Sequence, residues 1–237
     1  MKPKVVHIIS DLGSGGAERS LFKLAESNLA NTYDFSVICL KGEGMYSQKL
    51  RRQGINVIAL NLNYFNFLFK LFALALYLYK VRPQIIQGWM YHGNIAALIG
   101  KYMLFATPKL VWNIRHSLHS IKYEKKTTQA IIYLNKTFSQ AANLIIYNSS
   151  NSLAQHNKYG FAKSLTSVIE NGFDETIELN VMARKELRDR HKFKESTIVI
   201  GHVARFHPMK GHKVFIKAAL MILEINPFVE ILMIGRN

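Results

Sequence analysis

The chain has 237 residues, 49% of them hydrophobic and 11% aromatic, which is typical of a folded globular protein and excludes a disordered or fibrous one. Its single cysteine, Cys39, excludes an internal disulfide framework and favours a reducing compartment. Most of the net charge of +16 lies in residues 1–159, which contain 19 Lys and Arg and 6 Asp and Glu. The sequence has no nucleic-acid-binding motif, so this excess of positive charge favours an anionic membrane surface as partner.

The first predicted strand, Lys4–Ser10, leads into a glycine-rich turn. Gly15 and Gly16 leave backbone N–H groups open before a helix predicted over Ser20–Leu29, where an anionic group can approach closely. The spacing is not a dinucleotide-binding pattern, because Glu18 occupies a position that needs Gly or Ala for packing. A plain turn is the alternative interpretation.

Short apolar runs then alternate with helical patterns along the chain. A helix predicted over Tyr46–Gln53 separates two strands, and the same rhythm continues as far as residue 147. This alternation predicts an α/β fold with a parallel sheet and right-handed crossovers. The strands are expected over Phe35–Leu40, Ile55–Leu60, the run from Gln84, Leu110–Ile114 and Asn143–Tyr147.

The segment Leu62–Tyr79 is nearly long and apolar enough to be a membrane span. One helical stripe of it is small or polar: Asn63, Asn66, Lys70, Ala73 and Tyr77. The opposite side is apolar: Phe65, Leu68, Phe69, Phe72 and Leu76. The pattern predicts an amphipathic helix that packs on the sheet or lies at a membrane surface, because Lys and Asn within a span are costly.

Polar side chains follow two of the predicted strands. His92 lies in a polar loop before a helix predicted over Ile95–Phe105, and Arg115 and His116 directly follow the strand Leu110–Ile114. The carboxyl ends of parallel strands share one edge of a sheet, where ligands bind. Ligand contact is the functional interpretation of Arg115 and His116. Solvated strand-end residues are the alternative, and we favour that alternative for His92.

A second strand–loop–helix unit lies near the end of the sequence, with a strand over Thr197–Val203 and a helix from Lys213. Arg205 and Lys210 stand between them, at the carboxyl end of the strand and the start of the helix. A guanidinium fork and an ammonium group at such a place suit a diphosphate. Two solvated loop cations are the alternative.

Five strings of the sequence resemble GT-B glycosyltransferases of family GT4. VARFHPMKGHKVFIKAA is similar to the signature that opens their second domain, with Ala204 where Gly is most frequent. GSGGAERSLFKLA resembles their first loop and helix. RPQIIQGWMYHGN and KLVWNIRHS resemble two of their strands, with Gln84 in place of Asp. SVIENGFD resembles the interdomain signature, with Glu170 in place of Pro.

The resemblance implies two Rossmann-like domains: an acceptor-side domain over 1–171 and an incomplete nucleotide-sugar-binding domain over 172–237. It also implies roles for nine residues: His116 and Arg115 at the reaction centre, Gly15, Gly16, Arg205 and Lys210 on the donor, and His92, Asn171 and Gly172 on the acceptor or between the domains. We expect no cofactor and no metal, since no Asp-x-Asp occurs, and a UDP- or GDP-sugar as donor.

The implied reaction is a retaining transfer of a sugar to a lipid-linked or cell-envelope glycan, as in polysaccharide, lipopolysaccharide or capsule biosynthesis. We expect it in the cytoplasm, with the protein peripheral on the inner face of the membrane. The family's E-x7-E element is not found after Lys210, so the sequence is interpreted as the front portion of a glycosyltransferase, either a truncated gene product or a fragment of a longer one.

The sequence allows three other interpretations, two of which it disfavours. A catalytically inactive binding protein with an intact acceptor-type domain would bind lipid surfaces without binding nucleotide. An NAD-dependent oxidoreductase is disfavoured by Glu18 and by Lys41, which stands where a ribose-binding acid is expected. A zinc site is disfavoured by the five-residue spacing of three histidines across a strand, a loop and a helix: His202, His207 and His212.

Overall fold

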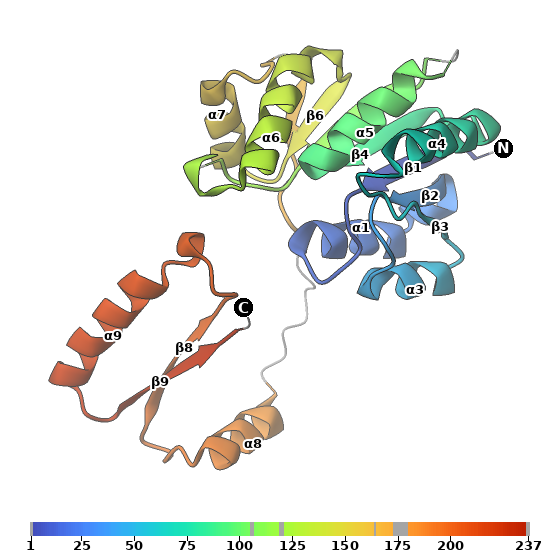
Figure 1. Ribbon diagram of the computed structural model, residues 1–237. Coiled ribbons are helices and arrows are strands. Elements are labelled where there is room, and N and C mark those ends of the chain that lie inside the picture. The colour runs from blue at the N-terminus through green and yellow to red at the C-terminus, as the bar shows by residue number, and fades with distance from the viewer. Residues whose placement is uncertain (1, 105–106, 119–120, 164, 173–179, 236–237) are drawn as a thin grey trace. The chain divides into compact units, whose positions relative to one another are not determined.

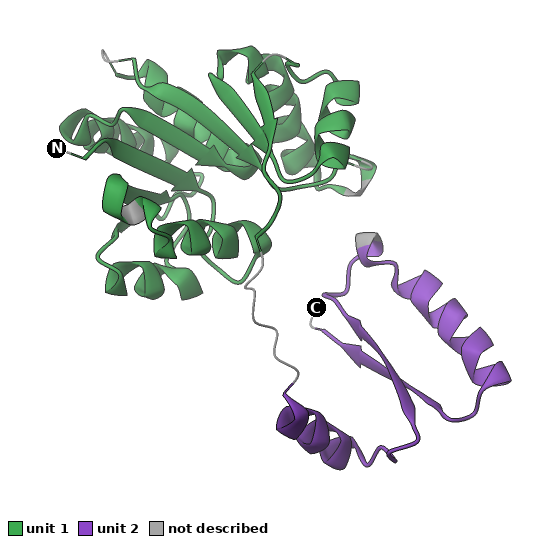
Figure 2. Ribbon diagram, turned by 180° about the vertical axis from the view of Figure 1, so that it is seen from behind, with its two compact units in different colours: residues 1–173 green, residues 174–237 purple. Residues whose placement is uncertain are grey.

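The computed structural model in Figure 1 describes residues 2–104, 107–118, 121–163, 165–172 and 180–235. The chain divides into two compact units, residues 1–173 and 174–237, coloured separately in Figure 2. Each unit pairs parallel strands with helices, so the expected α/β fold is confirmed.

The first unit is built on one sheet of seven parallel strands in the order β3-β2-β1-β4-β5-β6-β7. The strands are β1 (Lys4–Ile9), β2 (Asp34–Cys39), β3 (Asn56–Ala59), β4 (Ile85–Trp89), β5 (Lys109–Ile114), β6 (Leu144–Tyr147) and β7 (Thr166–Val168). The helices are α1 (Gly16–Glu26), α2 (Leu29–Thr32), α3 (Met45–Arg52), α4 (Phe67–Val81), α5 (Met90–Tyr102), α6 (Lys126–Phe138) and α7 (Ser150–Tyr159), with 3-10 turns η1 (Ile121–Tyr123) and η2 (Ser139–Ala141).

Helices cover both faces of this sheet, as Figure 1 shows for α1 and α3 on one side and α4 and α5 on the other. Val6 and Ile8 of β1 belong to the core under α4 and α5, whereas Val5 and Ile9 belong to the core under α1 and α3. Successive residues of a strand point to opposite faces, so a central strand buried on both sides must be apolar throughout.

The lone cysteine ends β2 and is a small core residue. Cys39 is fully buried, and its thiol donates to Gly42 O at 3.3 Å. Burial raises the pKa of this thiol to about 11, with a further contribution from the negative charge of Asp11. Cys39 is therefore a packing residue and not a nucleophile.

Helix α4 starts later than the pattern predicts and turns a different side inward. Asn63 and Asn66 exchange hydrogen bonds from backbone N–H to side-chain oxygen, 2.8 and 3.1 Å long, and this turn delays the helix to Phe67. Leu74 and Leu78 are the fully buried residues, and the opposite apolar side is exposed. Helix α4 thus packs on the sheet, as one of the two interpretations predicts, but through Leu74 and Leu78 and not through the more apolar opposite side. No helix within the described ranges is long and apolar enough to cross a membrane.

Helix α5 starts earlier than predicted, at Met90, directly after β4. A Cβ atom on Gly93 would lie 2.3 Å from Ile8 O, and one on Gly88 would lie 2.5 Å from the Asn94 Cα. These two glycines therefore let the first turn of α5 press on the backbones of β1 and β4. As a result His92 lies on a helix and not in the predicted loop.

The second unit contains α8 (Val181–His191), β8 (Ile198–Val203), the turn η3 (Pro208–Lys210), α9 (His212–Ile225) and β9 (Val229–Ile234). The two strands pair in parallel. Arg188 of α8 is buried and donates to Lys194 O at 2.6 Å and Thr197 O at 2.7 Å, which ties α8 to the start of β8.

His7 is a buried histidine in the centre of β1. Trp89 Nε1 donates to its Nδ1 at 3.2 Å, so the ring proton is on Nε2. Burial lowers the pKa of His7 from 6.5 to about 4. The folded chain therefore holds this ring neutral at pH values where the unfolded chain protonates it.

The first unit should accordingly lose stability in mild acid. Because the folded pKa of His7 is depressed, its contribution is complete above pH 6.5 and is lost as the pH falls toward 4. We expect the free energy of unfolding to fall by about 2 kcal/mol between pH 7 and 5 from this residue. Urea denaturation followed by tryptophan fluorescence isolates this unit, because both tryptophans, Trp89 and Trp112, belong to it.

In a His7→Asn variant, the part of the pH dependence of the free energy of unfolding that comes from His7 should be absent. A His191→Asn variant, changed at an exposed position of α8, should show the same pH dependence as the native chain. Identical pH dependence in the native chain and in His7→Asn would contradict the assignment.

Candidate functional site

The loops that follow the parallel strands of the first unit lie along its carboxyl edge, and the glycine-rich turn after β1 is one of them. Asp11 Oδ1 accepts from Gly13 N at 2.6 Å, which closes the turn. Gly15 is the N-cap of α1, and a Cβ atom there would lie 2.1 Å from Glu18 Oε2. The Glu18 carboxylate thus folds back over the turn and occupies the N-terminus of α1 beside Gly15.

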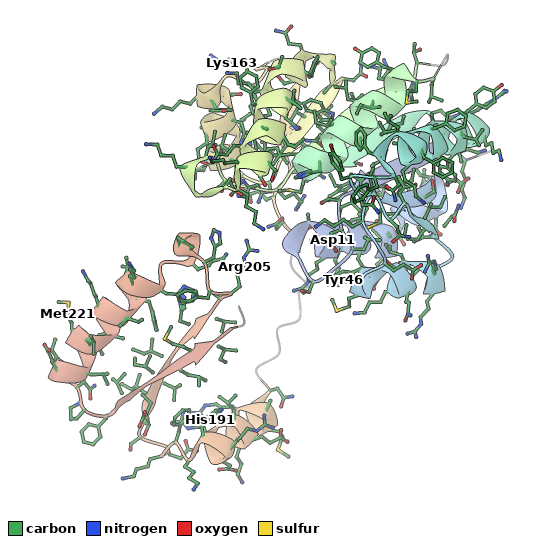
Figure 3. The ribbon with its side chains drawn as sticks, in the orientation of Figure 1. Asp11, Tyr46, Lys163, His191, Arg205 and Met221 are labelled. Atoms are coloured by element: carbon green, nitrogen blue, oxygen red, sulfur yellow. The ribbon has the colours of Figure 1, made fainter. Side chains whose placement is uncertain are left out.

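Charges of both signs surround this turn. Lys41 Nζ lies 3.8 Å from Asp11 Oδ2. The pKa of Glu18 is raised, first by burial and then by the negative charge of Asp11, against the lowering effect of a backbone hydrogen bond. A phosphate group placed at Gly15 and Gly16 would therefore have to displace the Glu18 carboxylate. Figure 3 labels Asp11 in this region.

The first turn of α5 lies next along the edge. Met90 has a left-handed backbone with φ 61°, an uncommon conformation for a residue with a side chain, and its Sδ accepts a weak hydrogen bond from Arg115 N at 3.4 Å. The pKa of the exposed His92 is lowered, first by desolvation of its ring and then by the positive charge of Lys41. His92 is thus a neutral side chain at the edge.

Arg115 follows β5, and its guanidinium donates to the side-chain oxygen of Asn171, in the segment after β7. Arg115 is half-buried, and desolvation lowers its pKa. Two residues selected from the sequence are thus brought together, and Gly172 follows directly. This contact connects the end of β5 to the end of the first unit.

His116 is held by two side chains that the sequence did not single out. Its Nε2 lies 3.3 Å from Glu124 Oε1, and its Nδ1 lies 3.3 Å from the Tyr91 hydroxyl. That hydroxyl lies 2.8 Å from His156 Nε2, and His156 Nδ1 lies 2.8 Å from Ser152 O. Ser152 Oγ in turn donates to His116 O at 2.7 Å, so a closed ring of contacts joins β5, α5 and α7.

The backbone carbonyl of Ser152 determines the direction of these hydrogen bonds. Ser152 O accepts only, so His156 donates from Nδ1, and because burial lowers its pKa to about 4 the ring is neutral and its Nε2 accepts from Tyr91. The single Tyr91 proton is then used, and its oxygen accepts from His116 Nδ1. The Nε2 atom of His116 faces the Glu124 carboxylate, which favours the imidazolium form.

Sequence reasoning missed Tyr91, Glu124 and His156. Tyr91 lies in a string that resembles a family strand, but the sequence analysis selected its neighbour His92 as the candidate residue. His156 and Glu124 carried no signal, because they lie 40 and 8 residues from His116 and meet it only in the folded chain. Asn135 adds a support for Tyr91 that spacing also could not show: its Nδ2 donates to Tyr91 O at 2.9 Å.

In the second unit, Arg205 follows β8 and Lys210 ends the turn before α9. Gly211, with φ 67°, is the N-cap of α9, so both cations stand at the N-terminus of a 14-residue helix. Figure 3 shows Arg205 at the end of the unit where β8 ends and α9 begins. Both side chains are exposed, and within the described part of the chain neither forms an ion pair with a carboxylate. The site therefore presents two cations and helix N–H groups to an anion.

The three histidines weighed as a zinc site are at the same end, and two of them pack on each other: the rings of His202 and His212 are 4.7 Å apart. In the part of the chain that the structure describes, no three His, Cys, Asp or Glu side chains are grouped so as to hold a metal ion.

The sequence profile described as "Glycosyltransferase Family 4" matches residues 14–176, more than half of the chain. The chain belongs to glycosyltransferase family 4. The matched region holds the glycine-rich turn, His92, Arg115, His116 and Asn171. A comparison with curated proteins gave no match.

Solved structures with the same fold agree with the family assignment. The Anabaena protein HepE in complex with UDP-glucose is 22% identical, with a TM-score of 0.78 over 98% of this chain and 60% of HepE. A glycosyltransferase from Rickettsia africae is 15% identical, with a TM-score of 0.71 over 100% of this chain and 69% of that protein. The lipopolysaccharide outer core galactosyltransferase WaaB is 13% identical, with a TM-score of 0.65 over 98% and 68%.

At these identities the likeness establishes the fold, and the expected Rossmann-like architecture of GT-B type is confirmed. The family 4 chain spans about three fifths of the length of HepE.

The ring of contacts around His116 predicts the effect of removing one hydroxyl. Tyr91→Phe leaves the buried Nε2 of His156 without its donor, so the free energy of unfolding of the first unit should fall by about 1–3 kcal/mol. Urea denaturation by tryptophan fluorescence measures it. The matched change Tyr133→Phe, at an exposed position of α6, should stay within about 0.5 kcal/mol of the native value. Equal stabilities of the two variants would show that the Tyr91 hydroxyl is not part of the network.

Proposed function

We propose that this family 4 chain acts in glycosyl transfer, moving a sugar from a nucleotide-diphosphate donor, a UDP- or GDP-sugar, to an acceptor hydroxyl. The observation that carries the proposal is the placement of two exposed cations, Arg205 and Lys210, at the N-terminus of α9 in a chain whose residues 14–176 match the family. HepE, which shares the fold, binds UDP-glucose. Because the chain spans only part of the length of HepE, the transfer reaction is proposed for the whole enzyme to which this chain corresponds.

The proposed chemistry is electrostatic. As the sugar–phosphate bond breaks, negative charge develops on the departing diphosphate, and Arg205, Lys210 and the first N–H groups of α9 stabilise it. We propose no metal and no cofactor, and retention of the anomeric configuration. Gly15 and Gly16 are proposed as a further donor contact, which requires the Glu18 carboxylate to move aside.

Arg115 and His116 are proposed to lie at the reaction centre. With both ring nitrogens of His116 engaged, by Tyr91 and by Glu124, the imidazolium contributes a fixed positive charge and is not a free base. Arg115 is oriented by Asn171. His92 is proposed as an acceptor contact, since it is exposed and neutral at the same edge.

A lipid-linked or cell-envelope glycan is the proposed acceptor, as in the synthesis of polysaccharide, lipopolysaccharide or capsule, at the inner face of the cytoplasmic membrane. The basic first unit supports this choice, because such acceptors lie at an anionic surface. WaaB, a lipopolysaccharide outer core galactosyltransferase by name, shares the fold.

Calorimetric titration with UDP, UDP-glucose and GDP-glucose tests the donor site. We expect saturable binding to one nucleotide class, and Arg205→Ala and Lys210→Ala should each weaken it by roughly ten-fold, because each removes a charge-assisted contact to phosphate. Lys217→Ala is the matched control: it removes the same charge from an exposed position further along α9 and should leave the affinity unchanged.

Binding that is insensitive to Arg205 and Lys210 would contradict this donor site. A folded chain that binds no nucleotide but does bind the acceptor would instead support the second candidate, a binding protein with an acceptor-type domain only.

A further inference from the structure

A row of exposed apolar side chains lies on α4 and the turn before it. We call this set the α4 face; with their exposed fractions, its members are Tyr64 (93%), Phe65 (96%), Leu68 (79%), Phe69 (70%), Phe72 (63%) and Leu76 (44%). Leu68, Phe72 and Leu76 recur at steps of four residues within α4, so they lie on one side of the helix, and Tyr64 and Phe65 lie in the turn before it. Single exposed apolar residues are common, but a contiguous row of aromatic rings marks an interaction surface.

The exposure of the α4 face is fixed by the packing of the opposite side of the helix. Leu74 and Leu78 are fully buried, and a Cβ atom on Gly100 of α5 would lie 2.6 Å from Leu78 Cδ1. The Tyr77 hydroxyl accepts from Asn56 Nδ2 at 3.1 Å, which holds the helix to β3. Rotating α4 to bury Phe65 or Phe69 would break both contacts.

The charged residues of α4 and of the sequence that flanks it have one sign. Between Glu43 and Glu124 the sequence has no Asp or Glu, whereas it has ten Lys and Arg. Among them are Lys70 and Lys80 of α4 and Arg82, whose guanidinium lies 5.8 Å from the centre of the Tyr79 ring. A row of aromatic and leucine side chains on a helix whose charged residues are all cations complements a surface that is apolar inside and anionic outside.

A lipid bilayer with anionic headgroups is such a surface. Tyrosine and phenylalanine rings enter the region of the headgroups and the upper acyl chains, while lysine and arginine bind the phosphates. Helix α4 has 15 residues and is about 22 Å long, which suits a helix lying flat on a membrane. A protein partner would need many unpaired acidic side chains around its apolar contact surface, so a bilayer is the simpler partner for this face.

We propose that the α4 face docks the first unit on an anionic lipid bilayer, with Tyr64, Phe65, Leu68, Phe69 and Phe72 inserted below the headgroups. The segment before α4 lies at the carboxyl edge of the sheet: Leu62 N donates to Leu40 O at 2.8 Å, beside the loop after β2. Bilayer contact therefore begins at the edge that carries His92 and Arg115. Insofar as it brings a lipid-linked acceptor to that edge, the inference rests on the proposed function.

Co-sedimentation of the full chain with phospholipid vesicles tests the docking surface. We expect saturable binding to phosphatidylcholine vesicles containing about a third phosphatidylglycerol, weaker binding to phosphatidylcholine alone, and weakening by added salt. Phe65→Ser/Phe69→Ser should reduce the partition coefficient by at least roughly ten-fold, because two large apolar side chains no longer enter the bilayer. Both positions are exposed, so the fold should be unaffected.

Tyr133→Ser/Phe138→Ser is the matched control, since it removes two aromatic rings from exposed positions of α6 and should leave vesicle binding unchanged. Equal loss in both double variants, or no loss in either, would overturn the assignment of the α4 face. Absence of vesicle binding together with a dimer that Phe65→Ser/Phe69→Ser dissociates would also overturn it, in favour of a second copy of the chain as the occupant.

The vesicle assay and the nucleotide titration test the two proposals independently. Vesicle binding without nucleotide binding keeps the docking surface and removes the proposed donor function. Nucleotide binding without vesicle binding keeps the donor function and removes the docking surface.

Discussion

The close approach of α5 to the centre of the sheet is the contact on which the candidate site depends. At Gly93 the helix lies against the backbone of β1 with no space for a side chain, and at Gly88 the strand lies equally close to the helix. Because the helix begins there without a connecting loop, Tyr91 points into the core, where it joins His116 to His156, while His92 stays at the solvent edge. The left-handed backbone at Met90 is the local cost of this abrupt change from strand to helix.

The two candidate phosphate sites differ in electrostatics, although both stand at a helix N-terminus after a parallel strand. At α1 the Glu18 carboxylate already occupies the N-terminus. At α9 the two cations Arg205 and Lys210 have no carboxylate partner in the described part of the chain. An anion therefore meets an attractive site in the second unit and a competing carboxylate in the first. Glycine content and helix position alone do not distinguish the two sites as phosphate-binding sites.

The sequence predicted the structure correctly where a local pattern is typical of a single element. Unbroken apolar runs such as Val5–Ile9 identified central parallel strands, and the positions of Arg115 and Arg205 after such runs placed them at strand ends. It did not identify the buried side of α4, because the apolar residues Leu74 and Leu78 that pack on the core lie outside the most apolar side of the helix. It also failed for the ring of contacts around His116, which depends on helix packing and on a residue, His156, 40 positions away.

The buried thiol of Cys39 has a practical consequence for work on this protein. Since it is the only cysteine and its burial keeps it protonated, the native chain should react very slowly with maleimide or iodoacetamide reagents. A cysteine introduced at an exposed position, on α4 or beside Arg205, would then be the one site that takes a spin label or fluorophore. Distances within and between the two units become accessible to spectroscopy without any need to remove the natural residue.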